Sequence, residues 1–450
     1  MTTKVIARGA ALLVGAAILS GPASAQQPLP EAVSPLVQAY NQSGHDLFRK
    51  FAQAPGNIVM SPYSIGTAMA MVLSGARGET RDEMLAALRH TLAPTDIAAA
   101  NEQALALLAA YNDARGPCPR GFEADGLLCK APAPDNPDQA CRQDGKREGN
   151  TCIVDAPPAD VKLRLANALM LVNAAASVAP DFEETMRTRF GAEVFRGASL
   201  EPVNDWANKK TEGKIDKILD KLSQDSSHVL LNAIYFNGPW ATPFPKSATR
   251  DRPFRLTPKQ SVDVPSMSMQ TSLALVKAEG FSAIRLPYAA EGLSMIVVRP
   301  DDIDGIDKVI AGLDGAGLAK LAVELRETEP RRVMVMMPRF KAAYGADLVT
   351  PFKALGMSKV FDYTQSDLSG LTGVPRSETQ SAIDQIVHRA VIDVSETGTE
   401  AAAVTAVVVN TRRAIIMPDT FNVDRPFMFL IADDKTGAIL FEGRISDPRS

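Results

Sequence analysis

Side chains that could carry out catalysis are few in this 450-residue chain. It contains only four histidines, His45, His90, His228 and His388, and no GxSxG, HExxH or P-loop motif. A Ser-His-Asp triad assembled from distant segments stays open. Each histidine is more simply interpreted as a surface residue or a hydrogen-bonded core residue. The scarcity of catalytic motifs favours binding or inhibition over catalysis, and no motif indicates a cofactor.

The four cysteines lie close together, with ten, eleven and ten residues between them. The sequence DGLLC ends the first half of the segment and EGNTC ends the second. This similarity indicates two repeated loops, each closed by its own bridge, although four cysteines allow three pairings. A zinc site is the alternative, but the segment has neither CxxC spacing nor histidine. The predicted bridges are Cys118–Cys129 and Cys141–Cys152.

The segment of about residues 116–158 that carries these cysteines is rich in proline, glycine and charged residues. It shows little apolar periodicity, so it cannot bury a core of its own. We therefore predict a surface insertion that is held by its disulfides.

The N-terminus has the pattern of a secretory signal peptide. Lys4 and Arg8 precede an apolar run at residues 10–19, and Ala23-Ser24-Ala25 supplies a small-x-small cleavage site. A membrane anchor is the alternative, but the run is short for a bilayer. We predict cleavage after Ala25 and export of residues 26–450, to a periplasm or the cell exterior, where disulfides persist.

The overall charge points to no polyanionic partner. The formal net charge is −4, and there is no long run of like charges. Nucleic-acid binding is therefore not expected. No later segment reaches membrane-spanning length, so we expect no membrane contact by the mature chain.

The stretch SETGTEAAAVTAVVVNTRRA at residues 395–414 combines signals that conflict. Its alanines favour helix, whereas its valines favour strand. Two adjacent arginines, Arg412 and Arg413, end it. Taken alone, it could be an Ala-rich surface helix or a permanent strand that ends in a dibasic turn.

The elements around these residues indicate an α+β fold with sizeable sheets, because helices and strands alternate without a regular βαβ repeat. Apolar periodicity predicts helices at 31–53, 61–76, 77–92 and 179–195. Ser61-Pro62 marks one helix start, Thr80 and Glu83 form a predicted capping box, and Gly191 marks one helix end. Strands are predicted at 161–172, 228–237, 282–288, 293–300, 331–340, 427–433 and 438–445.

Six segments together resemble the serpin family of protease inhibitors. They begin with NIVMSPYSIGTAMAMVLSGARGETRDEM at 57–84, and the others follow in the family's order over almost the whole mature chain. The resemblance implies a single domain at 26–450, interrupted by the cysteine insertion, with large mixed β-sheets, a surrounding helix cluster and an exposed reactive-centre loop at about 396–417. The other five segments are 230–244, 285–302, 367–373, 386–406 and 421–448.

In serpins a target protease cleaves this loop, which then inserts into the main sheet as a strand while the protease stays covalently attached. The hinge matches the inhibitory pattern, except that Val404 is larger than the usual alanine. As a strand, the loop would point Thr399, Ala401, Ala403 and Thr405 inward and the intervening side chains outward. No proline lies between residues 398 and 416, so every N–H can enter a ladder. The hinge residues are Glu396, Thr397, Gly398, Thr399, Glu400, Ala401, Ala402, Ala403 and Val404.

The resemblance also implies a cleaved bond. Counting seventeen residues from Glu396, as in inhibitory relatives, places Arg412 on the acyl side and Arg413 on the leaving side. An arginine there suits a trypsin-like protease. Counting back from residues 425–427 gives Ile415–Ile416 instead, which suits an elastase- or chymotrypsin-like enzyme. A solvated basic turn is the remaining interpretation of the two arginines.

Five further residues match positions of the family. Ser61, Ser64, Asn232 and His388 correspond to a polar cluster beneath the main sheet, which would hold its central strands together and let them part. The same four could be ordinary hydrogen-bonded core residues. Trp240 corresponds to a tryptophan where the loop first enters the sheet, and packing is its expected role.

Two functions follow from the resemblance. The first is a monomeric suicide-substrate inhibitor of serine proteases, which the hinge favours. The second is a non-inhibitory serpin-fold binding protein that proteases simply cleave. An exported hydrolase is a weaker third possibility.

Overall fold

The computed structural model describes residues 29–119, 121–136, 139–173, 176–222, 226–399 and 418–449. The predicted signal peptide and most of the predicted loop, residues 400–417, lie outside this part of the chain. Within the described part, no helix is long and apolar enough to cross a membrane.

The helices pack against two of the sheets, and the four that were predicted all form. The Ser61 hydroxyl caps α2 by accepting the Ser64 N–H at 3.0 Å, and Gly191 ends α5 in the left-handed conformation. The helices are α1 (Val33–Phe51), α2 (Pro62–Gly75), α3 (Gly78–Ala87), α4 (Pro94–Ala109), α5 (Pro180–Phe190), α6 (Glu201–Lys210), α7 (Ile306–Gly312), α8 (Gly315–Glu327), α9 (Val349–Ala354) and α10 (Ser369–Thr372).

The predicted capping box at Thr80 and Glu83 is wrong. Helix α3 starts two residues before Thr80, and Thr80 is buried inside it. Its hydroxyl accepts the Asp367 N–H at 2.9 Å, and Glu83 accepts the Lys359 N–H at 2.8 Å. Both side chains therefore bind segments that are distant in sequence, which a local motif cannot reveal.

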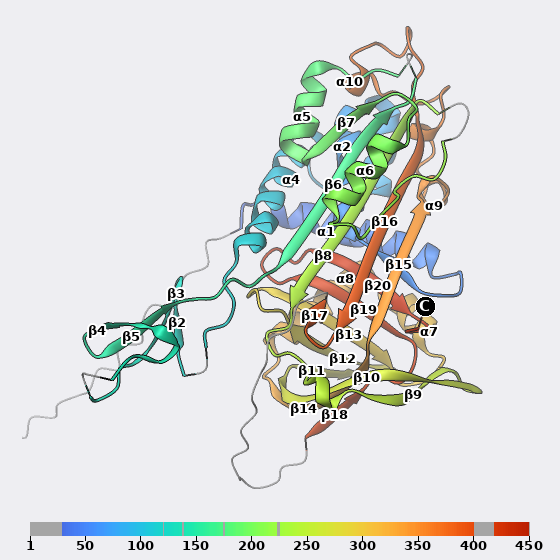
Figure 1. The fold of residues 1–450 in the computed structure, drawn as a ribbon. Coiled ribbons are helices and arrows are strands. Elements are labelled where there is room, and N and C mark those ends of the chain that lie inside the picture. The colour runs from blue at the N-terminus through green and yellow to red at the C-terminus, as the bar shows by residue number, and fades with distance from the viewer. Residues whose placement is uncertain are drawn as a thin grey trace, which may run out of the picture.

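The long strands of a six-stranded main sheet run along the length of the body (Figure 1). Figure 1 shows its long strands side by side, with α6 in front and α2 behind. The strands are, in sheet order, β15 (Phe340–Asp347), β16 (Ile383–Ser395), β17 (Gly398–Thr399), β8 (His228–Pro239), β6 (Lys162–Leu171) and β7 (Ala192–Arg196).

The main sheet is buried on both faces, which explains why β8 is a nearly continuous apolar run. Leu230 and Ile234 belong to the large core, which also contains residues of α2. Val229 and Leu231 belong to a smaller core with Trp206 of α6. The alternation of side chains along a strand therefore serves two cores at once.

Two more sheets complete the body and confirm the predicted α+β class. One has the order β1 (Ile58–Met60), β20 (Ile439–Ile445), β19 (Phe427–Asp433), β13 (Leu293–Pro300), β12 (Phe281–Pro287) and β11 (Leu275–Ala278). The other has the order β18 (Asp419–Asn422), β14 (Arg331–Pro338), β10 (Gln260–Leu273) and β9 (Arg250–Thr257). The body strands that were not predicted are β1, β7, β9, β10, β11, β15, β16, β17 and β18.

The cysteine segment forms a small sheet of its own, away from the body in Figure 1. The disulfides join Cys118 to Cys129 and Cys141 to Cys152, as the repeat indicated. Its four strands were not predicted, because the segment shows little apolar periodicity. They pair only with one another. They are β2 (Glu123–Asp125), β3 (Leu128–Pro132), β5 (Thr151–Asp155) and β4 (Lys146–Glu148).

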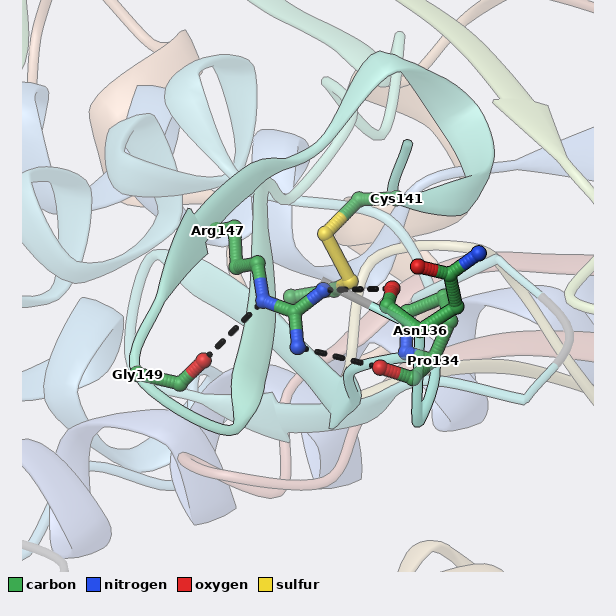
Figure 2. The surroundings of a disulfide bond; sticks show 6 residues. Pro134, Asn136, Cys141, Arg147 and Gly149 are labelled. Atoms are coloured by element: carbon green, nitrogen blue, oxygen red, sulfur yellow. Dashed lines mark hydrogen bonds between the residues drawn. A yellow bond between two sulfur atoms is a disulfide. The ribbon is translucent and has the colours of Figure 1, made fainter. Parts of the chain in front are cut away.

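Hydrogen bonds from Arg147 to the backbone reinforce this small sheet (Figure 2). Beside the Cys141–Cys152 bridge, its guanidinium donates to the carbonyl oxygens of Pro134, Asn136 and Gly149 at 3.0 to 3.2 Å. A disulfide and a cation thus replace the apolar core that the segment is too small to form.

Candidate functional site: the seam between β8 and β16

Within the described part of the main sheet, the boundary between β8 and β16, here called the seam, changes its pairing along its length. From Ile383–His228 to Val391–Tyr235 the two strands pair directly and in parallel. Beyond that point, β17 lies between them, antiparallel to both. Thr399 pairs with Val394 of β16 and with Gly238 of β8. The sheet is therefore already open at one end and closed along the rest of the seam.

The residue types of β17 fit a narrow opening. Gly398 has φ +150°, and a Cβ there would lie 2.6 Å from the Pro239 Cα. Glycine is therefore required, because the two backbones approach too closely for a side chain. Thr399 is fully buried, and its hydroxyl lies 2.8 Å from that of Tyr288.

The residues just before β17 are anchored at the same end of the seam. Trp240 donates from its indole nitrogen to the Ser395 oxygen at 2.9 Å and from its backbone to the Thr397 oxygen at 3.0 Å. The indole ring also stacks on Tyr288, with the ring centres 4.7 Å apart. The structure thus places Trp240 where the hinge meets the sheet.

Glu396 is a buried carboxylate with two side-chain donors. Arg339 donates from Nε at 2.7 Å, and the Thr249 hydroxyl donates at 2.5 Å. Burial by itself would raise the pKa of Glu396, but the hydrogen bonds from Arg339 and Thr249 outweigh burial and lower that pKa. The charged carboxylate therefore ties the hinge to the segment after β14 and to the start of β9.

Halfway along the seam, the four predicted cluster residues meet. His388 and Asn232 face each other across the strands, with His388 Nδ1 2.5 Å from Asn232 Oδ1. The Asn232 amide donates to the Ser64 hydroxyl and to Asn167 Oδ1, both at 2.6 Å. The Ser61 N–H donates to His388 Nε2 at 3.3 Å. The cluster links β6, β8, β16 and the start of α2, and all five residues are buried.

The hydrogen bonds of His388 fix its tautomer. A backbone N–H can only donate, so Nε2 accepts from Ser61, and Nδ1 carries the proton that is donated to Asn232. The ring is therefore neutral. Burial lowers the pKa of His388 to about 3, which agrees with the neutral form. The bond between His388 and Asn232 crosses the seam, so it must break if the strands separate.

A comparison with known protein families identifies the family that has this architecture. The model of the serpin family, described as serine protease inhibitor, matches residues 38–448. The chain belongs to the serpin family. The family as a whole is one of protease inhibitors rather than of catalytic enzymes. Among the described residues, no three His, Cys, Asp or Glu side chains gather as they would around a metal ion.

Individual serpins match over nearly their whole length. The chain is 32% identical to the leukocyte elastase inhibitor of Equus caballus, covering 90% of this chain and 97% of that protein. It is 31% identical to Iripin-5 of Ixodes ricinus, covering 91% and 93%. The native structure of tengpin, a thermophilic serpin, superposes with a TM-score of 0.74 at 22% identity, covering 94% of this chain and 96% of tengpin, and shows the shared fold.

Asn167, Arg339 and Tyr288 contact predicted site residues but were not themselves predicted from the sequence. Asn167 interrupts the apolar run of residues 165–171, and this interruption is a signal that could have revealed it. Arg339 and Tyr288 carry no local signal, because their partners Glu396 and Thr399 lie 57 and 111 residues away. Only the pairing of distant strands brings these residues together.

Several predicted residues of the serpin loop lie outside the described part of the chain. They comprise the second half of the hinge and both candidates for the cleaved bond, so their roles stay predictions. These residues are Glu400, Ala401, Ala402, Ala403, Val404, Arg412, Arg413, Ile415 and Ile416.

Proposed function

We propose that this serpin is a suicide substrate of a serine endopeptidase. The protease cleaves the reactive-centre loop, forms an acyl-enzyme, and is trapped when the loop enters the seam between β8 and β16. The observation that carries this proposal is β17, whose two residues already lie between these strands. Gly398 and Thr399 start a strand that the rest of the loop can extend.

The register of β17 predicts where the following residues would pair. In an antiparallel pair, each step along the loop moves one position back along β8 and β16. Six residues beyond Thr399 is Thr405, and six positions back from Gly238 and Val394 are Asn232 and His388. The Thr405 hydroxyl would thus arrive where the bond between His388 and Asn232 has to break, and could replace it.

The same register supports cleavage after Arg412. The seam ends at His228 of β8, which would pair with residue 409 of the inserted loop. Ten steps of about 3.3 Å would carry the loop roughly 33 Å along the sheet. The acyl carbonyl of Arg412 would then lie three residues beyond the end, and the protease would be pressed against the far end of the molecule.

Trapping requires only that deacylation fails. The protease hydrolyses its acyl-enzyme with an aligned triad and oxyanion hole. A pull of this length distorts that alignment, while strand addition supplies the driving force. The uncleaved chain is then a kinetically trapped state.

The partner and the setting follow from the same residues. Arg412 fits a primary specificity pocket with a carboxylate at its base, so the target is a trypsin-like protease. The two disulfides and the predicted signal peptide support a location outside the cytoplasm. The inhibitor acts as a monomer, because the hinge and the seam lie in one chain.

Incubation with trypsin followed by denaturing electrophoresis tests the proposal. A covalent complex is expected, whereas clean cleavage without a complex would indicate a non-inhibitory serpin. Arg412→Ala should slow trypsin inhibition by orders of magnitude, and Arg413→Ala should change it much less. Unchanged kinetics in Arg412→Ala would shift the bond to Ile415–Ile416 and the target to an elastase- or chymotrypsin-like protease.

A further inference from the structure

A second polar cluster lies at the end of the seam farthest from β17. There the pairing of β16 with β8 is irregular, because Ile383 pairs with His228 and Gln385 pairs with Val229. Asp384 is the extra residue between them. Such a bulge redirects a side chain that would otherwise follow the regular alternation.

The Asp384 carboxylate is directed at His228, the first residue of β8, and at Ser227 just before it. Its Oδ2 accepts the Ser227 N–H at 2.7 Å, the Ser227 hydroxyl at 3.0 Å and the His228 N–H at 3.0 Å. The Tyr363 hydroxyl donates to its Oδ1. Ser227 and His228 are buried, and His228 Nε2 lies 3.3 Å from the Ser177 oxygen, so this end of β8 is also held from its other side.

Three of these hydrogen bonds cross the seam. They differ from the cluster at mid-seam because their acceptor is a carboxylate, and bonds to ionised groups are roughly twice as strong as neutral ones. Separation of β8 from β16 at this end would leave a partly buried carboxylate without its backbone donors. The end of the seam is therefore harder to open than a plain strand pair.

We propose that Asp384 is a positioning residue that clasps the far end of the seam and limits the last steps of loop insertion. This inference rests on the proposed function, since it concerns the path of the inserting strand. By the register of β17, residues 400–407 can enter while the clasp stays closed. Residues 409 and 410 must displace it, because they would pair opposite His228 and Ile383.

Synthetic peptides with the sequence of the loop test the clasp without any protease. A peptide of residues 400–412 has to open the clasp, and a peptide of residues 400–407 stops short of it. Asp384→Asn removes the charge at nearly constant volume. It should accelerate incorporation of the long peptide into the uncleaved protein about tenfold or more. Incorporation of the short peptide should stay at the wild-type rate.

Two further variants separate the clasp from general destabilisation. Tyr363→Phe removes one donor and leaves the three bonds across the seam, so it should accelerate the long peptide by a smaller factor. Asp263→Asn changes an exposed carboxylate of β10, in another sheet and away from the seam, and should have no effect.

The possible outcomes are distinct. If both peptides enter Asp384→Asn and wild type at equal rates, the clasp does not exist, although insertion does. If Asp384→Asn accelerates both peptides alike, the residue only stabilises the fold, and the proposal is also overturned. If neither peptide enters any variant, the seam accepts no strand, and the proposed function fails with it.

Discussion

The Thr399 hydroxyl lies 2.8 Å from the Tyr288 hydroxyl, and both side chains are buried in the uncleaved chain. The tip of the hinge is thus fastened inside the sheet before any protease acts. This contact joins β17 to the residue that follows β12. The ring of Tyr288 also stacks on the indole ring of Trp240. The energy of this contact therefore contributes to how strongly β17 is held between β8 and β16.

Tyr288→Phe should lower the free energy of unfolding by about 1–3 kcal/mol, because it leaves the Thr399 hydroxyl buried without its partner. Thr399→Val should cost a similar amount for the same reason. The double variant should cost less than the sum of the two single variants, since no unpaired hydroxyl remains. Urea unfolding of the four proteins measures this, and strict additivity would show that the two groups do not interact.

Thr399→Arg should turn the inhibitor into a substrate. From the sequence we expected this side chain to become buried on insertion, but it is buried beforehand. An unpaired cation there costs at least several kcal/mol, so β17 should leave the seam and insertion should slow. Electrophoresis after trypsin treatment should show more cleaved chain and less complex. Thr420→Arg, at an exposed position of β18, should keep the wild-type ratio.

Gly398→Ala should destabilise the uncleaved form more than Gly280→Ala does. Both glycines have positive φ, +150° and +82°, so alanine is strained at either position by about 1–3 kcal/mol. Only at Gly398 would the new Cβ also collide with backbone, whereas nothing lies within 4 Å at Gly280. Thermal unfolding measures the difference. Equal losses would mean that β17 is not held closely against β8.

The neutral His388 predicts a loss of stability in acid. Its pKa is about 3 in the folded chain, against about 6.5 when unfolded. Between these values the unfolded chain binds a proton that the folded chain does not, so stability falls as the pH is lowered.

His388→Gln should remove up to about 1.4 kcal/mol per pH unit of this slope between roughly pH 6 and pH 4. Urea unfolding at several pH values measures it. The comparison with wild type isolates His388 from the other histidines. Identical slopes would contradict a neutral buried ring.

Removal of residues 117–157 should leave trypsin inhibition intact. The Gly116 N–H donates to the Pro157 oxygen at 2.7 Å, and the Ala159 N–H donates to the Ala114 oxygen at 2.8 Å, so the ends to be joined are already adjacent. The strands between them pair only with one another. Complex formation and thermal unfolding of the deletion variant check this. An unfolded variant would show that the insertion supports the body.

The sequence by itself was enough for the fold class and the disulfides, whereas the full hinge at 396–404 stays a prediction. The hinge was recognisable because small residues that must serve as loop and then as strand leave a local pattern at 396–404. The disulfide pairing was readable because each bridge closes a short repeat. The resemblance to serpins was enough to predict Ser61, Ser64, Asn232 and His388, because each of them lies within one of the matching segments.

Only the tertiary structure decided how far the hinge is inserted and what holds the seam. Asn232 and His388 lie 156 residues apart, as Asp384 and His228 do, and their parallel strands meet only when the whole sheet forms. The bulge that directs Asp384 at β8, and the burial of Thr399 beneath Tyr288, depend on a register that no local pattern encodes. Sheet pairing is a non-local property, because hydrogen bonds can join strands that are separated by any length of chain. A short sequence pattern therefore does not specify the partner strand.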